Sequence, residues 1–147
     1  LLGIGRGADM EVARNAGVPT RVLVVDDATD VAEVLDRLLQ CWGFETRVAL
    51  DARTALELAP PFDPHVALVD IELPDLDGCQ LAGRLRAYGA SMYLVAMTGH
   101  CLAEDRERIA AAGFDLHLVK PVDVARIRAV ITEQRRERAD DTLAARA

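Results

Sequence analysis

Several polar residues stand directly after short apolar runs, at the points where strands of a parallel sheet would end. They are Asp26, Asp27, Asp70, Thr98 and Lys120. The carboxyl ends of parallel strands meet along one edge of an open sheet, and ligands bind in the crevice outside that edge. We therefore expect these side chains, which come from four separate segments, to converge on one polar site.

The residue types at this predicted site suit one kind of chemistry. Three carboxylates brought together repel one another unless a cation lies among them, and a site with few protein oxygens suits Mg²⁺, which keeps waters and accepts a phosphoryl oxygen. Lys120 adds a positive charge and Thr98 a hydroxyl donor, and both suit the equatorial oxygens of a phosphoryl group in transfer. Asp70, central in the expected sheet, is the natural nucleophile.

The elements that must position this site alternate along the chain. Apolar runs typical of strands are followed by segments with apolar residues at helical spacing, which is the pattern of βα units around a parallel sheet. The expected strands are 21–25, 44–48, 65–69, 92–97 and 115–119, and the expected helices are 31–42, 52–59, 81–88, 104–112 and 124–131. The pattern predicts an α/β fold of five such units, with 44–48 suited to an edge of the sheet.

Glycine and proline set the predicted helix ends. Gly43 ends the first helix, Pro60 and Pro61 end the second, and Gly113 caps the fourth. The apolar residues at helical spacing should face the core. On the first helix they are Val31, Val34, Leu35, Leu38, Leu39 and Trp42, and on the third they are Leu81, Leu85 and Tyr88.

Composition limits the class of protein. The chain has 147 residues, of which 51% are hydrophobic, so it can form one compact domain with a sizeable core. Its 17 Lys and Arg against 24 Asp and Glu give a net charge of −7, which disfavours direct binding to nucleic-acid phosphates. The apolar runs are too short to span a bilayer and no secretory signal begins the chain, so we expect a cytoplasmic protein without a membrane partner.

The chain divides into three predicted parts. Residues 20–135 form the expected domain, residues 1–19 with their four glycines form an arm or linker, and residues 136–147 are a polar extension of the last helix. The cysteines match neither a disulfide framework nor a zinc pattern, and we expect reduced, buried thiols. They are Cys41, Cys79 and Cys101.

Four motifs, in this order, point to a known family. They are Val24-Val25-Asp26-Asp27, then Val69-Asp70-Ile71-Glu72-Leu73-Pro74 with Asp77-Gly78, then Met97-Thr98-Gly99, and last Ala112-Gly113-Phe114-Asp115 leading to Lys120-Pro121. With them, the chain resembles the receiver domain of two-component response regulators from about residue 21 to residue 133. The resemblance implies a single flavodoxin-like, doubly wound (βα)5 domain with a parallel five-stranded sheet of order 2-1-3-4-5.

The resemblance also implies a role for each residue of the site. Asp70 would take a phosphoryl group from a sensor histidine kinase or a histidine phosphotransfer protein, and the domain would catalyse only its own phosphorylation and dephosphorylation. Thr98 would move to bond the phosphoryl group, Lys120 would pair with it, and the peptide before Pro121 would be cis. The implied ligands of the Mg²⁺ cofactor are Asp26, Asp27, Asp70 and the backbone carbonyl of Glu72.

One position departs from the common pattern of the family. Three residues before Lys120, where receivers commonly carry an aromatic residue that swings inward on activation, this chain has His117. Histidine there resembles the receivers fused to hybrid sensor kinases, which implies a hybrid-kinase or phosphorelay origin. Thr98 and His117 would be the switch residues, and the face made by the fourth helix, fifth strand and fifth helix would contact a partner or form a homodimer.

The individual residues have plainer alternatives. Asp26 and Asp27 could serve only as the N-cap region of the first helix, Thr98 could be an ordinary strand end, and Lys120 could be a solvated lysine. It is their predicted convergence that favours the functional interpretation. His65 and His100 are expected to be surface polar groups.

The function has alternatives as well. A phosphohydrolase of the haloacid dehalogenase type also combines a nucleophilic Asp, a hydroxyl, a Lys and Mg²⁺, but its Asp-x-Asp motif after the first strand is missing from Asp26-Asp27-Ala28. A pseudo-receiver would bind partners without phosphorylation. Loss of Asp70 or Lys120 would have favoured that alternative, and both residues are present.

Overall fold

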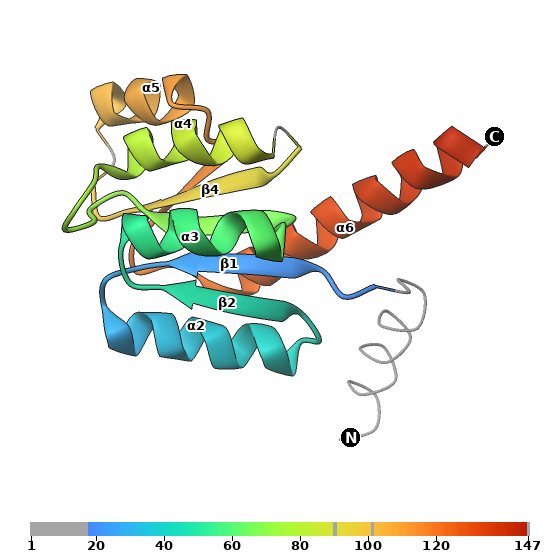
Figure 1. Cartoon of the computed structure of the whole chain (residues 1–147). Helices are drawn as coiled ribbons and strands as arrows, with labels where there is room; N and C mark the ends of the chain where they lie inside the picture. Colours follow the sequence, from blue (N-terminus) through green and yellow to red (C-terminus); the bar gives the residue numbers. More distant parts are fainter. Residues whose placement is uncertain (1–17, 90, 101, 147) are drawn as a thin grey trace.

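The computed structural model describes residues 18–89, 91–100 and 102–146, which form a parallel sheet with helices on both faces (Figure 1). The strands are β1 (Arg21–Val25), β2 (Glu45–Ala49), β3 (Val66–Asp70), β4 (Tyr93–Thr98) and β5 (Leu116–Val119). The helices are α2 (Thr29–Cys41), α3 (Ala52–Phe62), α4 (Gly78–Tyr88), α5 (Ala103–Ala111) and α6 (Val124–Arg146). The strand order is β2-β1-β3-β4-β5. The predicted flavodoxin-like fold is therefore confirmed.

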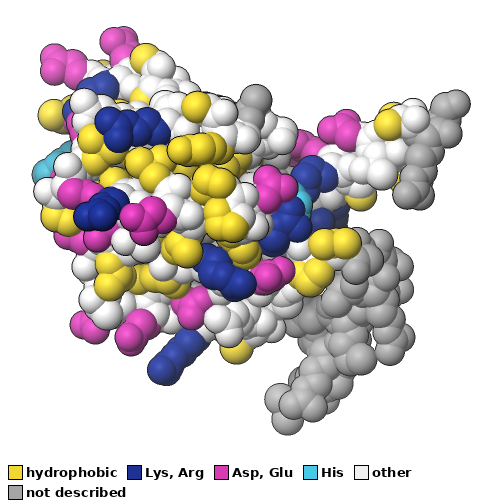
Figure 2. Space-filling view, in the orientation of Figure 1, with side chains coloured by type: hydrophobic (Ala, Val, Ile, Leu, Met, Phe, Trp, Pro, Cys, Tyr) yellow, Lys and Arg dark blue, Asp and Glu magenta, His cyan; other side chains and the backbone are white. Residues whose placement is uncertain are grey.

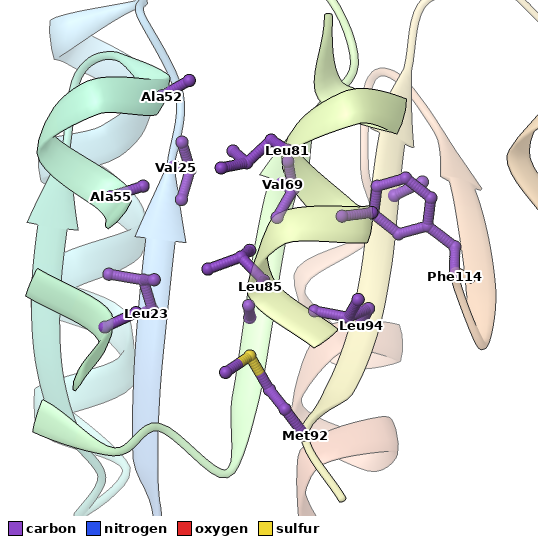
Figure 3. Packing of buried hydrophobic residues seen from close by; sticks show 14 of the residues in the cluster. Leu23, Val25, Ala52, Ala55, Val69, Leu81, Leu85, Met92, Leu94 and Phe114 are labelled. Atoms are coloured by element: carbon purple, nitrogen blue, oxygen red, sulfur yellow. The ribbon is translucent and has the colours of Figure 1, made fainter. Parts of the chain in front are cut away.

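Two hydrophobic layers enclose the sheet. Along β1, Leu23 and Val25 pack in the layer that also contains residues of α3, α4 and α5, whereas Val22 and Val24 pack in the layer formed with α2 and α6. Figure 3 shows the first layer, in which alanines of α3 and leucines of α4 close over these side chains. Because successive residues of a strand point to opposite faces, a strand covered on both sides needs an unbroken apolar run.

The helix α3 ends later than the sequence predicts. Pro60 and Pro61 lie inside the helix, which continues to Phe62, so the prediction that they end it was wrong. Both prolines are in the last turn and exposed, and the extra residues bring Phe62 into a buried position. The helix ends at Asp63, which has φ 50° and donates its N–H to the carbonyl of Ala59 at 2.8 Å. Burial of the ring has overridden the local preference of proline.

Some residues predicted to be buried are exposed. In α2, Leu35 and Leu39 are buried, but Val31 and Val34 are 43% and 55% exposed. In α4, Tyr88 is likewise exposed. The expectation of buried thiols was wrong for Cys41, which lies at the exposed end of α2. Helical spacing identified buried residues such as Leu35 and Leu39, but it carries no information on how far the covering sheet extends over Val31, Val34 and Tyr88.

The helix α6 is the longest element and begins on the sheet but ends beyond it (Figure 1). The polar extension predicted from residue 136 lies within this helix as far as Arg146. Most of the predicted arm at 1–19, and Cys101, lie outside the described residues. In the described part of the chain, no helix combines the length and the apolar character needed to cross a membrane.

Candidate functional site

The register of the sheet brings the predicted site residues to one edge. Val25 pairs with Val69, Asp70 with Met97, and Thr98 with Val119, so the carboxyl ends of the four strands that precede the site lie level. The residues that follow these strand ends therefore share one crevice, as the sequence predicts. The peptide between Lys120 and Pro121 is cis, in agreement with the family resemblance.

Three carboxylates form the centre of the site. Asp26 and Asp70 are 0% and 4% exposed, whereas Asp27 is exposed, and one oxygen from each lies within 4.8 Å of the others. Asp26 is held by its own loop, because its Oδ1 accepts the N–H of Ala28 at 2.9 Å. The N-cap residue of α2 is Ala28, and no side chain caps that helix, so capping does not explain the acidic pair.

A single ammonium group faces the two buried carboxylates. Lys120 Nζ lies 3.1 Å from Asp70 Oδ2 and 3.3 Å from Asp26 Oδ2. Burial alone would lower the pKa of Lys120, but the hydrogen bond and charge of Asp70, and then those of Asp26, outweigh burial and raise it. Lys120 is therefore a paired cation, and the alternative that it is merely a solvated lysine does not fit these contacts.

Asp70 is held as a buried acceptor. Its Oδ1 accepts the backbone N–H of Glu72 at 2.9 Å, while Oδ2 faces Lys120. Burial raises the pKa of Asp70, and the hydrogen bonds from Glu72 and Lys120 offset this only in part. Asp26 adds to the increase because its negative charge opposes a second one nearby. The site thus has an excess of negative charge that a cation would relieve.

The predicted switch residues lie on the neighbouring strands. The Thr98 hydroxyl is buried and donates to the backbone carbonyl of His100 at 2.8 Å, while it accepts the N–H of the same residue at 3.1 Å. It is thus engaged with its own loop. His117 is partly buried on β5. At the mouth of the site, the exposed side chains of Glu72 and His100 approach each other, with 3.7 Å between Oε1 and Nε2.

The sequence did not predict the loop that follows Asp70. Ile71 donates its N–H to Met97 and accepts the N–H of Gly78, both at 3.0 Å, so the segment between them forms a closed loop. Residue 78 must be glycine, because a Cβ there would lie 2.7 Å from the Cα of Ile71. Asp77 caps α4 by accepting the N–H of Cys79 at 2.8 Å. An Asp next to a helix start was the available signal.

An apolar groove also adjoins the site. It has a volume of about 630 Å³ and runs from α2 to the segment after β5. The residues that line it are Asp30, Val31, Val34, Leu35, Met97, Lys120, Pro121, Val122 and Val124. The two valines of α2 that the sheet leaves uncovered are therefore part of one surface, which reaches Lys120.

Comparison with known proteins agrees with this architecture. Residues 22–132 match the response regulator receiver domain. The transcriptional regulatory protein PrrA of Mycobacterium tuberculosis is 37% identical over 115 residues, which are 76% of this chain and 49% of PrrA. The sensor histidine kinase RcsC of Escherichia coli is 31% identical over 111 residues, which are 76% of this chain and 12% of RcsC. The chain thus spans at most about half the length of these two relatives.

A solved structure is similar over most of the fold. It is a response regulator protein from Burkholderia pseudomallei with a phosphorylated aspartic acid, a calcium ion and citrate. The TM-score is 0.72 at 27% sequence identity, over 85% of this chain and 74% of that chain. Because the family match covers most of the chain and the fold and motif order agree with it, this chain belongs to the response regulator receiver domain family.

Proposed function

We propose that this chain takes a phosphoryl group from a partner phosphohistidine onto Asp70 and thereby switches the binding of a partner. The observation that carries the proposal is the position of Asp70, a buried carboxylate between an acidic pair and Lys120. The phosphorylated aspartic acid in the Burkholderia pseudomallei relative supports the same chemistry. The only reaction that the domain would catalyse is then its own phosphorylation and dephosphorylation.

The transfer forms one bond and breaks another. A carboxylate oxygen of Asp70 attacks phosphorus, the bond from phosphorus to the donor imidazole nitrogen breaks, and the imidazole leaves with the electron pair. The Glu72 N–H holds Oδ1 of Asp70 and so fixes the orientation of the nucleophile. Lys120, already within 3.1 Å of the carboxylate, pairs with the oxygens of the incoming group.

The acidic cluster fits a divalent cation. Carboxylate oxygens are the ligands that Mg²⁺ prefers, and the three that converge here outnumber the single ammonium beside them. Asp26, Asp27 and Asp70, with the backbone carbonyl of Glu72, are the proposed ligands. When bound, Mg²⁺ would neutralise charge on the phosphoryl oxygens during transfer.

The groove beside Lys120 is the proposed contact for the phosphodonor. Its exposed valines, Val31 and Val34, give an apolar surface next to the reacting carboxylate, which suits the docking of a protein and not of a free phosphate ester. A sensor histidine kinase or a histidine phosphotransfer protein is the proposed partner. The similarity to the sensor kinase RcsC supports a hybrid-kinase or phosphorelay origin.

The proposed output is a population shift on the other side of the site. A phosphoryl group adds roughly −1.5 to −2 charge near Thr98 and Lys120. Drawing the Thr98 hydroxyl away from His100 would open space that His117 could enter from β5. The face formed by α5, β5 and α6 would then contact a partner or a second copy. NMR with beryllofluoride tests this, since amide shifts confined to the loops around Asp27, Asp70 and Thr98 would contradict it.

Intact mass decides the phosphoacceptor. With acetyl phosphate and Mg²⁺, the wild-type chain should gain one phosphoryl group and Asp70→Asn should gain none. Omission of Mg²⁺ should greatly slow the wild-type reaction. Equal phosphate uptake by the Asp70→Asn variant would overturn the assignment of Asp70.

A further inference from the structure

The loop between Ile71 and Gly78, which leads into α4, is also hydrogen-bonded to the start of α3. Asp75 Oδ1 accepts the N–H of Ala52 and Oδ2 accepts the N–H of Arg53, both at 3.0 Å. These two N–H groups belong to the first two residues of α3. Asp75 and the start of α3 line the same groove. The carboxylate thus bridges two segments 22 and 23 residues apart in sequence.

This bridge adds a second carboxylate to the capping of α3. The N-cap of α3 is already supplied locally by Asp51, whose Oδ1 accepts the N–H of Thr54 at 2.7 Å. Asp75 takes the two preceding amides, so the first three N–H groups of α3 all have carboxylate partners. The hydrogen bond from Ala52 lowers the pKa of Asp75, as expected for a carboxylate that accepts backbone N–H groups.

The bridged loop carries the groups next to the phosphoacceptor. Its ends are closed by the bond from Gly78 to Ile71, and Leu73 and Leu76 pack against the core. Glu72, whose N–H holds Asp70 Oδ1, lies three residues before Asp75. The two hydrogen bonds of the exposed Asp75 carboxylate join this stretch of the loop to the start of α3, and Asp77 pairs with Arg108 of α5 at 3.2 Å.

We propose that Asp75 is a positioning residue that anchors the 72–77 loop to the start of α3 and so fixes the Glu72 backbone at the phosphoacceptor and metal site. The proposal rests on the proposed function for the identity of the metal, but the geometric link does not depend on it. Residues that orient the groups around a metal typically change its affinity by about 10- to 100-fold when they are removed.

Asp51→Ala is a matched control for Asp75→Ala. Each variant removes one negative charge and part of the cap of α3, but only Asp75→Ala releases the loop. We expect similar decreases in Tm for both. Mg²⁺ titration followed by NMR at fixed ionic strength should give roughly 10-fold weaker binding in Asp75→Ala, and about the wild-type affinity in Asp51→Ala.

Amide hydrogen exchange gives a readout that needs no metal. The Glu72 amide should exchange several-fold faster in Asp75→Ala than in wild type, and unchanged in Asp51→Ala, because only the first variant frees the loop. Equal changes in the two variants, or protection at Glu72 that is unaltered in Asp75→Ala, would overturn the positioning role. Absence of Mg²⁺ binding by wild type would instead contradict the proposed function, and exchange at Glu72 would still decide the role of Asp75.

Discussion

The two ends of the sheet carry charged side chains of opposite sign. At the carboxyl ends of the strands, three carboxylates converge and a single ammonium, Lys120, lies within 3.3 Å of the buried pair, so negative charge is in excess. At the amino ends, positive side chains gather where α6 leaves the sheet (Figure 2). Arg21 pairs there with Asp63 at 3.4 Å, and Arg138 donates to the hydroxyl of Thr20 at 3.2 Å.

The amino end is organised by hydrogen bonds that join distant segments. The N–H of Arg21 donates to His65 Nδ1 at 2.9 Å, and Arg86 of α4 bonds the carbonyls of Met92 and Gly113 as well as the carboxylate of Asp115. Polar groups that bond one another in this way contribute to stability. At the carboxyl end, the excess of negative charge on Asp26, Asp27 and Asp70 can instead respond to an added cation. We therefore expect changes at the amino end to act mainly on stability, and changes at the carboxyl end to act mainly on the proposed phosphorylation.

Removal of the ammonium at the carboxyl end should have the largest effect. Lys120→Met leaves Asp26 and Asp70 without their cation and removes a donor to the phosphoryl group, so phosphorylation by acetyl phosphate should be about 100-fold slower. Arg138→Met removes a positive charge at the amino end, and its rate should stay within about 2-fold of wild type. Intact mass measures both rates, and equally slow phosphorylation of the two variants would show that the two ends do not differ in their role.

Removal of the central arginine at the amino end should act on stability instead. Arg86→Met removes the donor to two backbone carbonyls and one of the donors to Asp115, which keeps the N–H of Leu94, and we expect a loss of about 2 kcal/mol in the free energy of unfolding. The exposed Arg84 on the same helix is the control, and Arg84→Met should cost well under about 1 kcal/mol. Urea unfolding measures both, and a slow phosphorylation rate in folded Arg86→Met would argue against the separation of roles.

The sequence predicted the arrangement of residues at the carboxyl end better than the contacts at the amino end. The residues of the carboxyl end each end a strand or directly follow one, so the strand pattern alone places Asp26, Asp70 and Lys120 together. The contacts of the amino end have no such local signal, since Arg86 and Asp115 are 29 residues apart and Arg138 and Thr20 are 118 apart. Such pairs depend on how helices lie across the sheet.

His65 illustrates the difference. The prediction of a surface polar group missed its role as an acceptor, because the donor, the N–H of Arg21, comes from another strand. In the same way, the continuation of α3 through two prolines depends on burial of Phe62, which no pattern within the helix reveals. Positions that are set by a strand end could be predicted from the sequence, whereas positions that are set by packing between distant segments could not.

Low pH should decrease the stability of the folded chain through His65, which lies at the amino ends of the strands. Burial, and then the positive charges of Arg138 and Arg21, lower the pKa of His65 to about 4, with Asp63 acting in the opposite direction. In the unfolded chain the His65 ring binds a proton near pH 6.5. The contribution of neutral His65 to the free energy of unfolding should therefore be fully present above that pH and decrease as pH falls toward 4. For a ring that retains contact with solvent, we expect a loss of about 1 kcal/mol.

The variant His65→Gln isolates this contribution. Other groups titrate equally in both proteins, so the difference in unfolding free energy between wild type and His65→Gln should become less favourable to wild type from pH 7 to pH 5. Urea unfolding at several pH values measures it. A difference that does not change with pH would show that His65 is not held neutral by its surroundings.

The smallest expected effect compares the same substitution at both ends. Without metal, Asp27→Asn relieves repulsion with Asp26 and Asp70 and should raise the unfolding free energy by about 0.5 kcal/mol. Asp63→Asn breaks an exposed pair with Arg21 and should lower the unfolding free energy by a similar or smaller amount.

Added Mg²⁺ should stabilise wild type more than Asp27→Asn, since a ligand that binds the folded state more tightly stabilises it more. Asp63→Asn should respond to Mg²⁺ as wild type does. Thermal unfolding with and without Mg²⁺ measures all four changes, and the same sign for both variants without metal would mean that the two ends do not differ in their balance of charge.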